Sequence, residues 1–321
     1  MEIKEELYQD LKLDKDAFTP LSNDEKKVEA VVRPSVGYWK DAWRRLKENK
    51  LALFSLVAII LIILAAVFYP MISPFAYNEN NLELANQAPN GVHFFGTDHL
   101  GRDILVRVMY GARYSLMIGI SAAVINIIIG VIYGGISGFI GGKVDNFMMR
   151  IVDVLYSIPL TIYVIIFMAV FSTPGEDNGS GIGTIILALC ISYWINMARI
   201  VRGEVLQLKQ QEFVLAAKAL GASKARILFR HLIPNCVGSI IVTMTLLIPQ
   251  AIFTEAFLAF IGLGINPPLA SLGTLANEAQ KVISIYPYQL LFPALMICMI
   301  ILAFNLFGDG LTEALDPKNR V

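Results

Sequence analysis

Several uninterrupted apolar runs constrain the fold of this chain more than any other feature of its sequence. A run of about twenty apolar residues is long enough to cross the roughly 30 Å hydrocarbon core of a bilayer as a helix. Only helices and closed barrels satisfy their backbone polar groups there, and these runs lack the period-two alternation of barrel strands. Because 56% of the 321 residues are also hydrophobic, the sequence predicts an all-α polytopic membrane protein.

The positions of these runs predict six transmembrane helices. They are expected at 51–69, 114–140, 147–171, 183–200, 237–261 and 287–307. Pro159 is expected to kink the third helix, in which Arg150 and Asp153 lie one turn apart and can pair near the membrane surface. In the second helix glycine recurs every four residues, which predicts a stripe for close helix packing. The stripe consists of Gly130, Gly134, Gly138 and Gly142.

The polar ends of the chain are expected to lie outside the bilayer. Residues 1–36 favour a flexible cytoplasmic tail and residues 311–321 a second, short one. Residues 37–50 predict an amphipathic helix in the membrane interface, because its apolar and basic side chains lie on opposite faces. The apolar face carries Trp39, Trp43 and Leu46, and the basic face carries Lys40, Arg44 and Lys47.

Lysine and arginine are distributed unevenly between the two sides that six spans would create. Of the 26 cations, 22 lie in the two terminal regions, near 141–150 and in 199–230. Only Arg102, Arg107, Arg113 and Lys281 fall on the other side. The positive-inside rule therefore predicts that both termini and the 199–230 region are cytoplasmic.

Catalytic and metal-binding motifs are not evident, and the chain is not expected to be an enzyme. Gly142-Lys143 lacks the spacing of a phosphate-binding loop, and His93, His99 and His231 are too scattered for a metal site. Cys190, Cys236 and Cys298 are expected to be buried and inert. The formal charge of zero gives no sign of a nucleic-acid partner. Energy for transport would have to come from a partner protein or an ion gradient.

The segment 212–234 is the most informative cytoplasmic stretch. It predicts a short helix from Glu212 that stops at Gly221, where positive φ has no steric cost. Ser223 is expected to cap a second short helix, and Pro234 marks the entry to the fifth span. A small-residue helix at a sharp turn can fit a groove on another protein, although an ordinary solvated loop is the alternative.

This segment resembles the EAA loop, the cytoplasmic motif of ABC importer permeases. Ala216, Ala217, Gly221 and Pro234 stand at the expected spacing, whereas Leu215 occupies the acidic position and His231 the isoleucine position. Glu212, one turn earlier, is the nearest carboxylate. The resemblance implies that the loop docks on an ATPase through Glu212, Ala216, Ala217, Ala219, Leu220, Gly221, Ala222, Ser223 and Pro234.

Further motifs resemble the permeases of the peptide/nickel importer family, closest to the C-type oligopeptide subunit. They are Phe95-Gly96-Thr97-Asp98, Leu100-Gly101-Arg102-Asp103, Tyr110-Gly111-Ala112-Arg113, Met149-Arg150-Ile151-Val152-Asp153, Thr254-Glu255-Ala256-Phe257 and Gly308-Asp309-Gly310-Leu311. The resemblance implies the type I ABC importer fold, with an N-terminal region at 37–111 and a transmembrane domain at 112–310.

The same resemblance implies a complex in a bacterial plasma membrane. A homologous B-type permease would complete the path, and two ATPase subunits would bind ATP and Mg²⁺. An extracytoplasmic binding protein would deliver peptide near Gly96, Thr97, Asp98, Gly101, Arg102 and Asp103. Possible ion pairs there are Asp98 with Arg102 and Asp103 with Arg107. Alternatively, this stretch is a surface helix that only stabilises the connector.

The sequence is also compatible with other functions. The close relatives include dipeptide and nickel permeases. An ion-coupled carrier could use Arg150, Asp153 and Glu255 as a relay, although helix packing is an equally good role for Glu255. A membrane scaffold without transport activity is a third possibility.

Overall fold

A computed structural model describes residues 37–171 and 180–315. Within them every regular element is helical, apart from an isolated bridge between Thr97 and Asp103. Five helices are long and apolar enough to cross a membrane, and a bent pair provides a sixth crossing if it is counted as one span. The prediction of an all-α polytopic membrane protein is thus confirmed.

The helices that pass the membrane test are α3 (Lys50–Ile72), α4 (Ile104–Ile140), α7 (Ser180–Leu208), α11 (Val237–Phe260) and α13 (Tyr288–Leu315), with the bent pair α5 (Gly142–Tyr156) and α6 (Leu160–Phe171). Shorter elements are α2 (Tyr38–Glu48), the 3-10 turn η2 (Leu82–Leu84), α8 (Glu212–Ala219), α9 (Lys224–Arg226), the π-helix η3 (Ile227–Leu232), α10 (Ile233–Asn235) and α12 (Leu272–Gln280).

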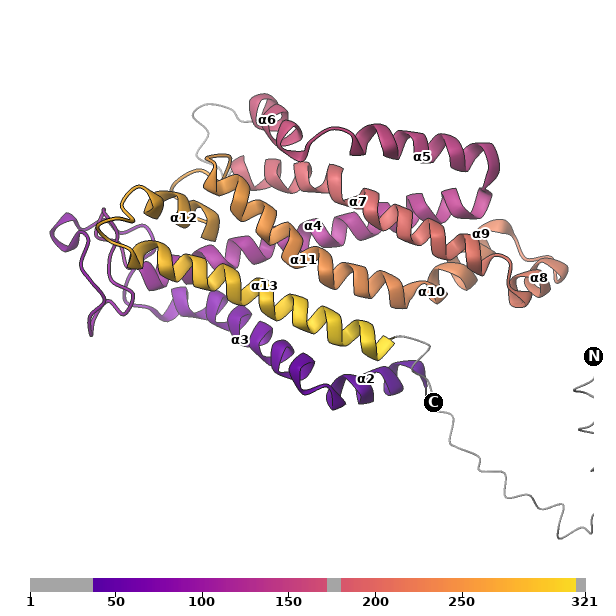
Figure 1. The fold of residues 1–321 in the computed structure, drawn as a ribbon, viewed down its shortest axis with the longest axis horizontal. Coiled ribbons are helices and arrows are strands. Elements are labelled where there is room, and N and C mark those ends of the chain that lie inside the picture. Colours follow the sequence, from indigo (N-terminus) through magenta and orange to yellow (C-terminus); the bar gives the residue numbers. More distant parts are fainter. Residues whose placement is uncertain (1–36, 172–179, 316–321) are drawn as a thin grey trace, which may run out of the picture. The chain divides into compact units, whose positions relative to one another are not determined.

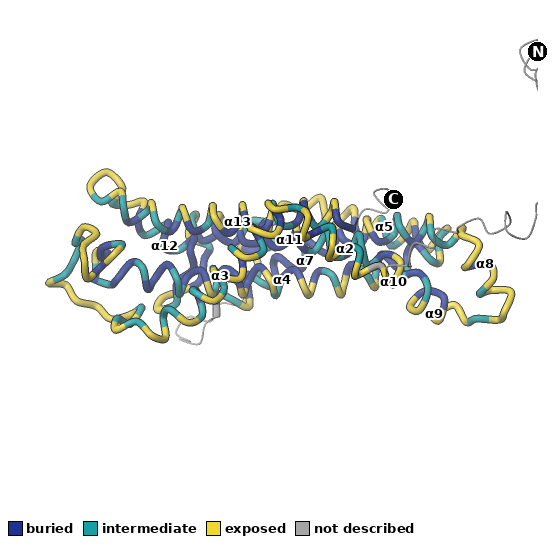
Figure 2. Tube along the Cα trace, turned by 90° about the horizontal axis from the view of Figure 1, so that it is seen from below, coloured by how far each residue is buried: buried dark blue, intermediate teal, exposed yellow. Residues whose placement is uncertain are grey.

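From residue 42 onward the chain forms one compact unit in which α4 is central. It packs against α3, α7, α11 and α13. The connector 73–103 and α12 lie at one end of this unit, and α8, α9 and α10 lie at the other (Figure 1). Buried residues follow the middle of the long helices, whereas α8 and the connector are largely exposed (Figure 2). Two separate ends are therefore available for contacts outside the bilayer.

The glycine stripe of α4 is the seam with α7. A Cβ atom at Gly134 would lie 2.2 Å from the carbonyl oxygen of Ala198, and one at Gly130 would lie 2.5 Å from the Cβ of Met197. A Cβ atom at Gly138 would lie 2.7 Å from the carbonyl oxygen of Arg202. The predicted packing role is confirmed for these three residues and wrong for Gly142, which begins α5 in open space.

The third predicted span is broken rather than kinked. α5 ends at Tyr156 and α6 begins at Leu160, with a bend of 81° between them. Pro159 lies in the break, where it restricts the residue before it to extended conformations. The predicted pair of Arg150 with Asp153 is also wrong, because the Asp153 carboxylate binds Arg199 of α7 at 2.9 Å.

Several helix ends differ from the prediction because local caps and contacts set them. α4 begins at Ile104, well before residue 114, because the Asp103 carboxylate accepts a hydrogen bond from the Val106 N–H at 2.9 Å. α7 runs on to Leu208 and α13 to Leu315, so residues 311–315 are helical. The remaining predicted tails, 1–36 and 316–321, lie outside the described residues.

Two expectations about single side chains are also corrected. Leu46 of α2 is buried against Ala52 and Ala314 instead of facing the headgroups, whereas Trp43 is exposed beneath the Lys47 ammonium group. Of the three cysteines, Cys190 and Cys236 are buried as expected, but Cys298 is exposed on α13.

Candidate functional site

The segment α8–α10 joins α7 to α11 at one end of the unit. Only three residues, Lys209 to Gln211, separate α7 from α8, and their N–H groups all bond to carbonyls of the last turn of α7. One face of α8 is anchored to the core, because Val214 is fully buried and Ala217 packs against the same cluster. The segment is therefore held in a defined position relative to α7 and α11.

The turn after α8 is a Schellman motif. Gly221 has φ +78, its N–H donates to the Lys218 carbonyl, and the Ala222 N–H donates to the Ala217 carbonyl, both at 3.0 Å. This is the 6→1 and 5→2 pattern that closes a helix at a residue with positive φ. The Ser223 hydroxyl then accepts from the Arg226 N–H. The predicted stop at Gly221 and cap at Ser223 are both confirmed.

The chain after Ser223 continues into the membrane without a further loop. α9 is followed by the π-helix η3, α10 and then α11. Pro234 is the second residue of α10, where its fixed φ suits the first turn of a helix. Movement of α8 would therefore act directly on both α7 and α11.

The outer face of α8 is apolar. Phe213, Ala216 and Leu220 follow i, i+3, i+7 spacing and are all exposed, Leu220 to 88%. The adjacent face carries Glu212, Leu215 and Ala219, which are also exposed. Leu215, at the position where the motif has an acid, thus extends an apolar surface, and Glu212 is the carboxylate of this face.

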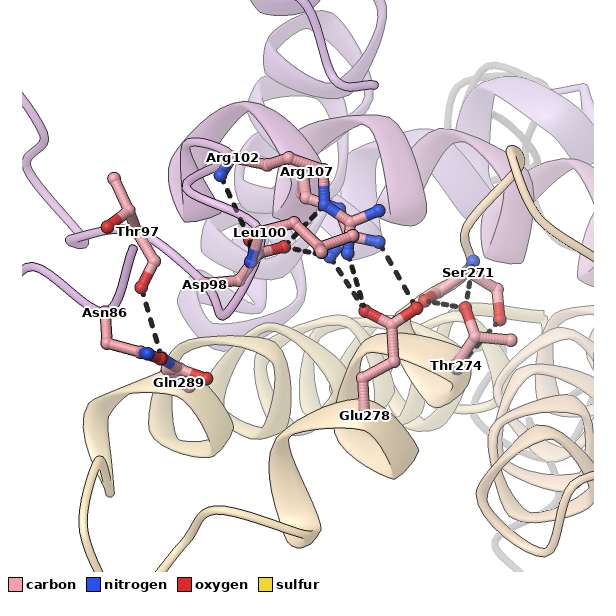
Figure 3. A network of polar contacts seen from close by, with 10 residues as sticks. All are labelled: Asn86, Thr97, Asp98, Leu100, Arg102, Arg107, Ser271, Thr274, Glu278 and Gln289. Carbon is pink, nitrogen blue, oxygen red and sulfur yellow. Dashed lines mark hydrogen bonds and ion pairs between the residues drawn. The ribbon is translucent and has the colours of Figure 1, made fainter. Parts of the chain in front are cut away.

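At the opposite end, an ion-pair cluster ties the connector to α4 and α12 (Figure 3). Asp98 binds the guanidinium groups of Arg102 at 2.7 Å and Arg107 at 2.5 Å. Arg107, only 4% exposed, also binds Glu278 of α12 at 2.8 Å. Burial alone would raise the pKa of Asp98, but Arg107 and Arg102 outweigh it and hold that pKa below its usual value.

A second set of contacts holds the same turn against α13. Gln289 donates to the Asn86 side chain at 2.9 Å and to the Thr97 carbonyl at 3.1 Å. Gly96 and Gly101 have φ near +75, and a Cβ at either would strike the backbone of Gln87 or Asn81. These glycines therefore allow two stretches of the connector to lie directly on each other.

The residues predicted at 96–103 form a turn rather than a surface helix. The predicted Asp98–Arg102 pair is present, but Asp103 binds His93 at 2.9 Å instead of Arg107. Thr97, Asp98 and Asp103 are buried, so their side chains serve internal contacts. Sequence reasoning missed Glu278, which is 171 residues from Arg107 and marked by no motif. A role of this turn beneath a binding protein stays a prediction.

Three possible metal ligands also meet at this cluster. Ligand atoms of Asp98, His99 and Glu278 lie within 4.8 Å of one another. However, both carboxylates already bind guanidinium groups, which repel a cation. The arrangement therefore serves as a clamp between elements.

The proposed relay residues are not brought together by the fold. Glu255 is fully buried in α11 and accepts a hydrogen bond from Ser115 of α4 at 2.8 Å. The same Ser115 hydroxyl accepts from the Leu272 N–H at the start of α12. Asp153 binds Arg199 instead, and Arg150 lies on the exposed side of α5. These contacts favour the helix-packing role for Glu255.

Comparison with known proteins defines the class. A family model described as a binding-protein-dependent transport system inner membrane component matches residues 126–321. A second model, the N-terminal TM domain of oligopeptide transport permease C, matches residues 37–89. The chain belongs to this family of ABC importer permeases.

Individual relatives are similar over nearly their whole length. The oligopeptide transport system permease protein OppC of Bacillus subtilis is 51% identical over 95% of this chain and 98% of its own. The dipeptide transport system permease protein DppC of the same organism is 49% identical, covering 93% and 92%. OppC of Escherichia coli K12 is 43% identical, covering 94% and 97%.

The fold has a solved counterpart. A chain of the MetNI methionine ABC transporter, in an inward-facing conformation, aligns with a TM-score of 0.53 at 17% identity. The match covers 65% of this chain and 96% of that one. It confirms the type I ABC importer permease fold.

Proposed function

We propose that this chain is the membrane-spanning subunit of an ATP-driven importer of oligopeptides. The observation that carries the proposal is the α8 segment, which is anchored by Val214 and presents Leu220 outward. The identity with oligopeptide permeases of two organisms supports the substrate. Because the dipeptide permease is almost equally similar, a dipeptide importer is the second candidate.

The complex that we propose contains four further kinds of component. A homologous permease completes the path, two ATPases dock at α8, a binding protein delivers peptide at the connector end, and the peptide is the cargo. ATP and Mg²⁺ bind to the ATPases, and this chain supplies no cofactor. Both termini and α8 face the cytoplasm, in keeping with the positive-inside rule.

The mechanism that we propose follows from the continuity of the backbone. Closure of the ATPases on ATP displaces α8, and the short helical joints pass this displacement to α7 and α11. The Schellman turn keeps the shape of the segment during this movement. Rotation of these two helices then exchanges inward and outward access to the peptide path.

Co-purification tests the docking. The chain is produced with its partner permease and ATPases, and Leu220→Glu is compared with Leu82→Glu. Leu82 is 71% exposed on the connector, at the opposite end. Leu220→Glu should weaken ATPase binding more than about tenfold, because a carboxylate would be buried without a partner. Leu82→Glu should leave it unchanged. Equal ATPase recovery from both variants would contradict docking at α8.

Uptake in vesicles tests the activity. ATP enclosed in the vesicles should drive uptake of a tetrapeptide by the assembled complex. A dipeptide and Ni²⁺ are added as competing substrates. Preference for the dipeptide would favour the second candidate. Uptake driven by a proton gradient without any ATPase would instead establish a secondary carrier.

A further inference from the structure

The helices α7 and α11, between which α8 is suspended, also enclose a groove. It holds about 370 Å³, and its lining includes Asn196 and Arg199 of α7 and Thr243 and Gln250 of α11. Leucine and isoleucine side chains complete the walls. The groove therefore lies between the last residues of the span predicted at 183–200 and the first half of the span predicted at 237–261.

The polar side chains follow the helical repeat on each wall. Asn196 and Arg199 are three residues apart, and Thr243 and Gln250 are seven apart, so each pair lies on one face. Asn196, Arg199 and Gln250 are exposed in this chain. Hydrocarbon offers no hydrogen-bond partner to such groups, so this face is suited to water or to a polar solute.

The two carboxamides are the uncommitted polar groups of this groove. Neither the Asn196 nor the Gln250 side chain makes a hydrogen bond with any residue in 37–171 or 180–315. Arg199, in contrast, binds Asp153 at 2.9 Å and stacks on Tyr156 at 4.7 Å. The charge of Arg199 is thus neutralised by Asp153, and the groups of the groove that are free to bind a solute are the uncharged carboxamides.

We propose that this groove is the part of the peptide path contributed by this subunit, and that Asn196 and Gln250 hydrogen-bond the backbone of the peptide in transit. A carboxamide offers both donors and an acceptor, which match the C=O and N–H groups that all peptides share. A path with neutral amides and a compensated arginine accepts peptides without selecting the charge of their side chains. The proposal rests on the function proposed above.

Position relative to α8 supports the same role. The groove walls are the two helices that receive movement from α8, so docking at α8 and the width of the groove change together. Other possible occupants are lipid and a helix of the partner permease. With either of these occupants, a soluble peptide is not expected to shield the groove from a chemical reagent.

Transport kinetics provide the first test. With the complete transporter in vesicles, Asn196→Leu and Gln250→Leu should each raise the KM for labelled trialanine about fivefold, the effect of one net hydrogen bond. Asn196→Gln and Gln250→Asn keep a carboxamide and should restore part of this loss. Unchanged KM values in both leucine variants would overturn the proposal.

Cysteine accessibility provides the second test. In an active transporter whose Cys190, Cys236 and Cys298 are replaced by alanine, Gln250→Cys should react with a water-soluble methanethiosulfonate. Saturating trialanine should slow this reaction. Leu61→Cys, at a site on α3 that is 60% exposed, should transport normally and stay unmodified as a lipid-facing control. No reaction at Gln250→Cys, or a rate unaffected by trialanine, would overturn the proposal.

The two levels of the proposal fail differently. If the unmodified complex does not import peptide with ATP, the proposed function fails. If the complex does import peptide, only the assignment of the groove fails when two results are obtained. The leucine variants then have the KM of the unmodified protein, and Gln250→Cys stays unmodified like Leu61→Cys.

Discussion

At the scale of single residues, the cluster of Asp98, Arg102, Arg107 and Glu278 joins the connector to two helices. All four side chains are largely withdrawn from water, and Arg107 bridges both acids. Removing one member leaves the others as buried charges without full compensation, which is more damaging than losing an exposed pair. The cluster therefore stabilises the connector end of the protein.

The cluster predicts a pH dependence of stability. The pKa of Asp98 is lowered in the folded protein, so its contribution is present at neutral pH and is lost as pH falls through the folded pKa. Asp98→Asn should cost about 3 kcal/mol at neutral pH, and the difference from the unmodified protein should shrink in acid. Thermal unfolding in detergent measures it. Asp309→Asn, at an exposed site on α13, is the control and should show no such trend.

Gly221 predicts a functional defect without a packing defect. A Cβ there would meet no atom within 4 Å, so the conformational cost arises from φ +78 alone. Gly221→Val should cost about 1–2 kcal/mol in this conformation and should uncouple ATP hydrolysis from uptake while the protein stays in the membrane. Gly221→Asn tolerates positive φ and should retain coupling. ATP hydrolysis and peptide uptake are measured in parallel for both variants. Normal uptake by the valine variant would contradict the role of the turn.

At the scale of elements, the seam between α4 and α7 depends on glycine. Gly134→Val would place a side chain against the Ala198 backbone and should destabilise the protein by about 2 kcal/mol or more through overpacking. Gly183→Ala, in α7 with open space around it, should be neutral or stabilising by up to about 1 kcal/mol. Melting temperatures in detergent compare the two. Equal effects would show that close approach is not what selects glycine at 134.

Sequence reasoning succeeded where a local rule decides the conformation. Hydropathy placed the membrane helices, and the requirement for positive φ placed the stop at Gly221. It failed where distant contacts decide: Pro159 indicated a bend but not its 81° size, and Asp153 found Arg199 rather than its helical neighbour. Only part of the cluster could be predicted from the sequence, because Glu278 is brought close to Asp98 only by the tertiary fold.

In the α8 segment, too, some features could be predicted from the local sequence and others depend on the tertiary fold. Its residue types predicted a short helix and a sharp turn, but not which face is buried. The fold turns Val214 inward and leaves Leu220 outward, which makes the proposed docking surface apolar. The missing acid at Leu215 is therefore consistent with docking through shape and apolar contact.

At the scale of the whole molecule, the unit from residue 42 onward has two chemically different ends. The clamp, with its paired charges, lies at the connector end. The α8 end carries cations that face outward, among them Lys218, Lys224 and Arg226. This separation agrees with the uneven distribution of lysine and arginine and predicts a single orientation in the bilayer.

Labelling from one side of the membrane tests that orientation. Single cysteines replace Glu79 on the connector and Lys224 beside α8, both exposed, after Cys190, Cys236 and Cys298 are changed to alanine. In intact cells a membrane-impermeant maleimide should modify Glu79→Cys and spare Lys224→Cys, because only the connector faces outward. Inverted vesicles should give the opposite result. If Lys224→Cys reacts in intact cells, α8 lies outside the cell, where ATPases cannot reach it, and docking at α8 cannot drive transport.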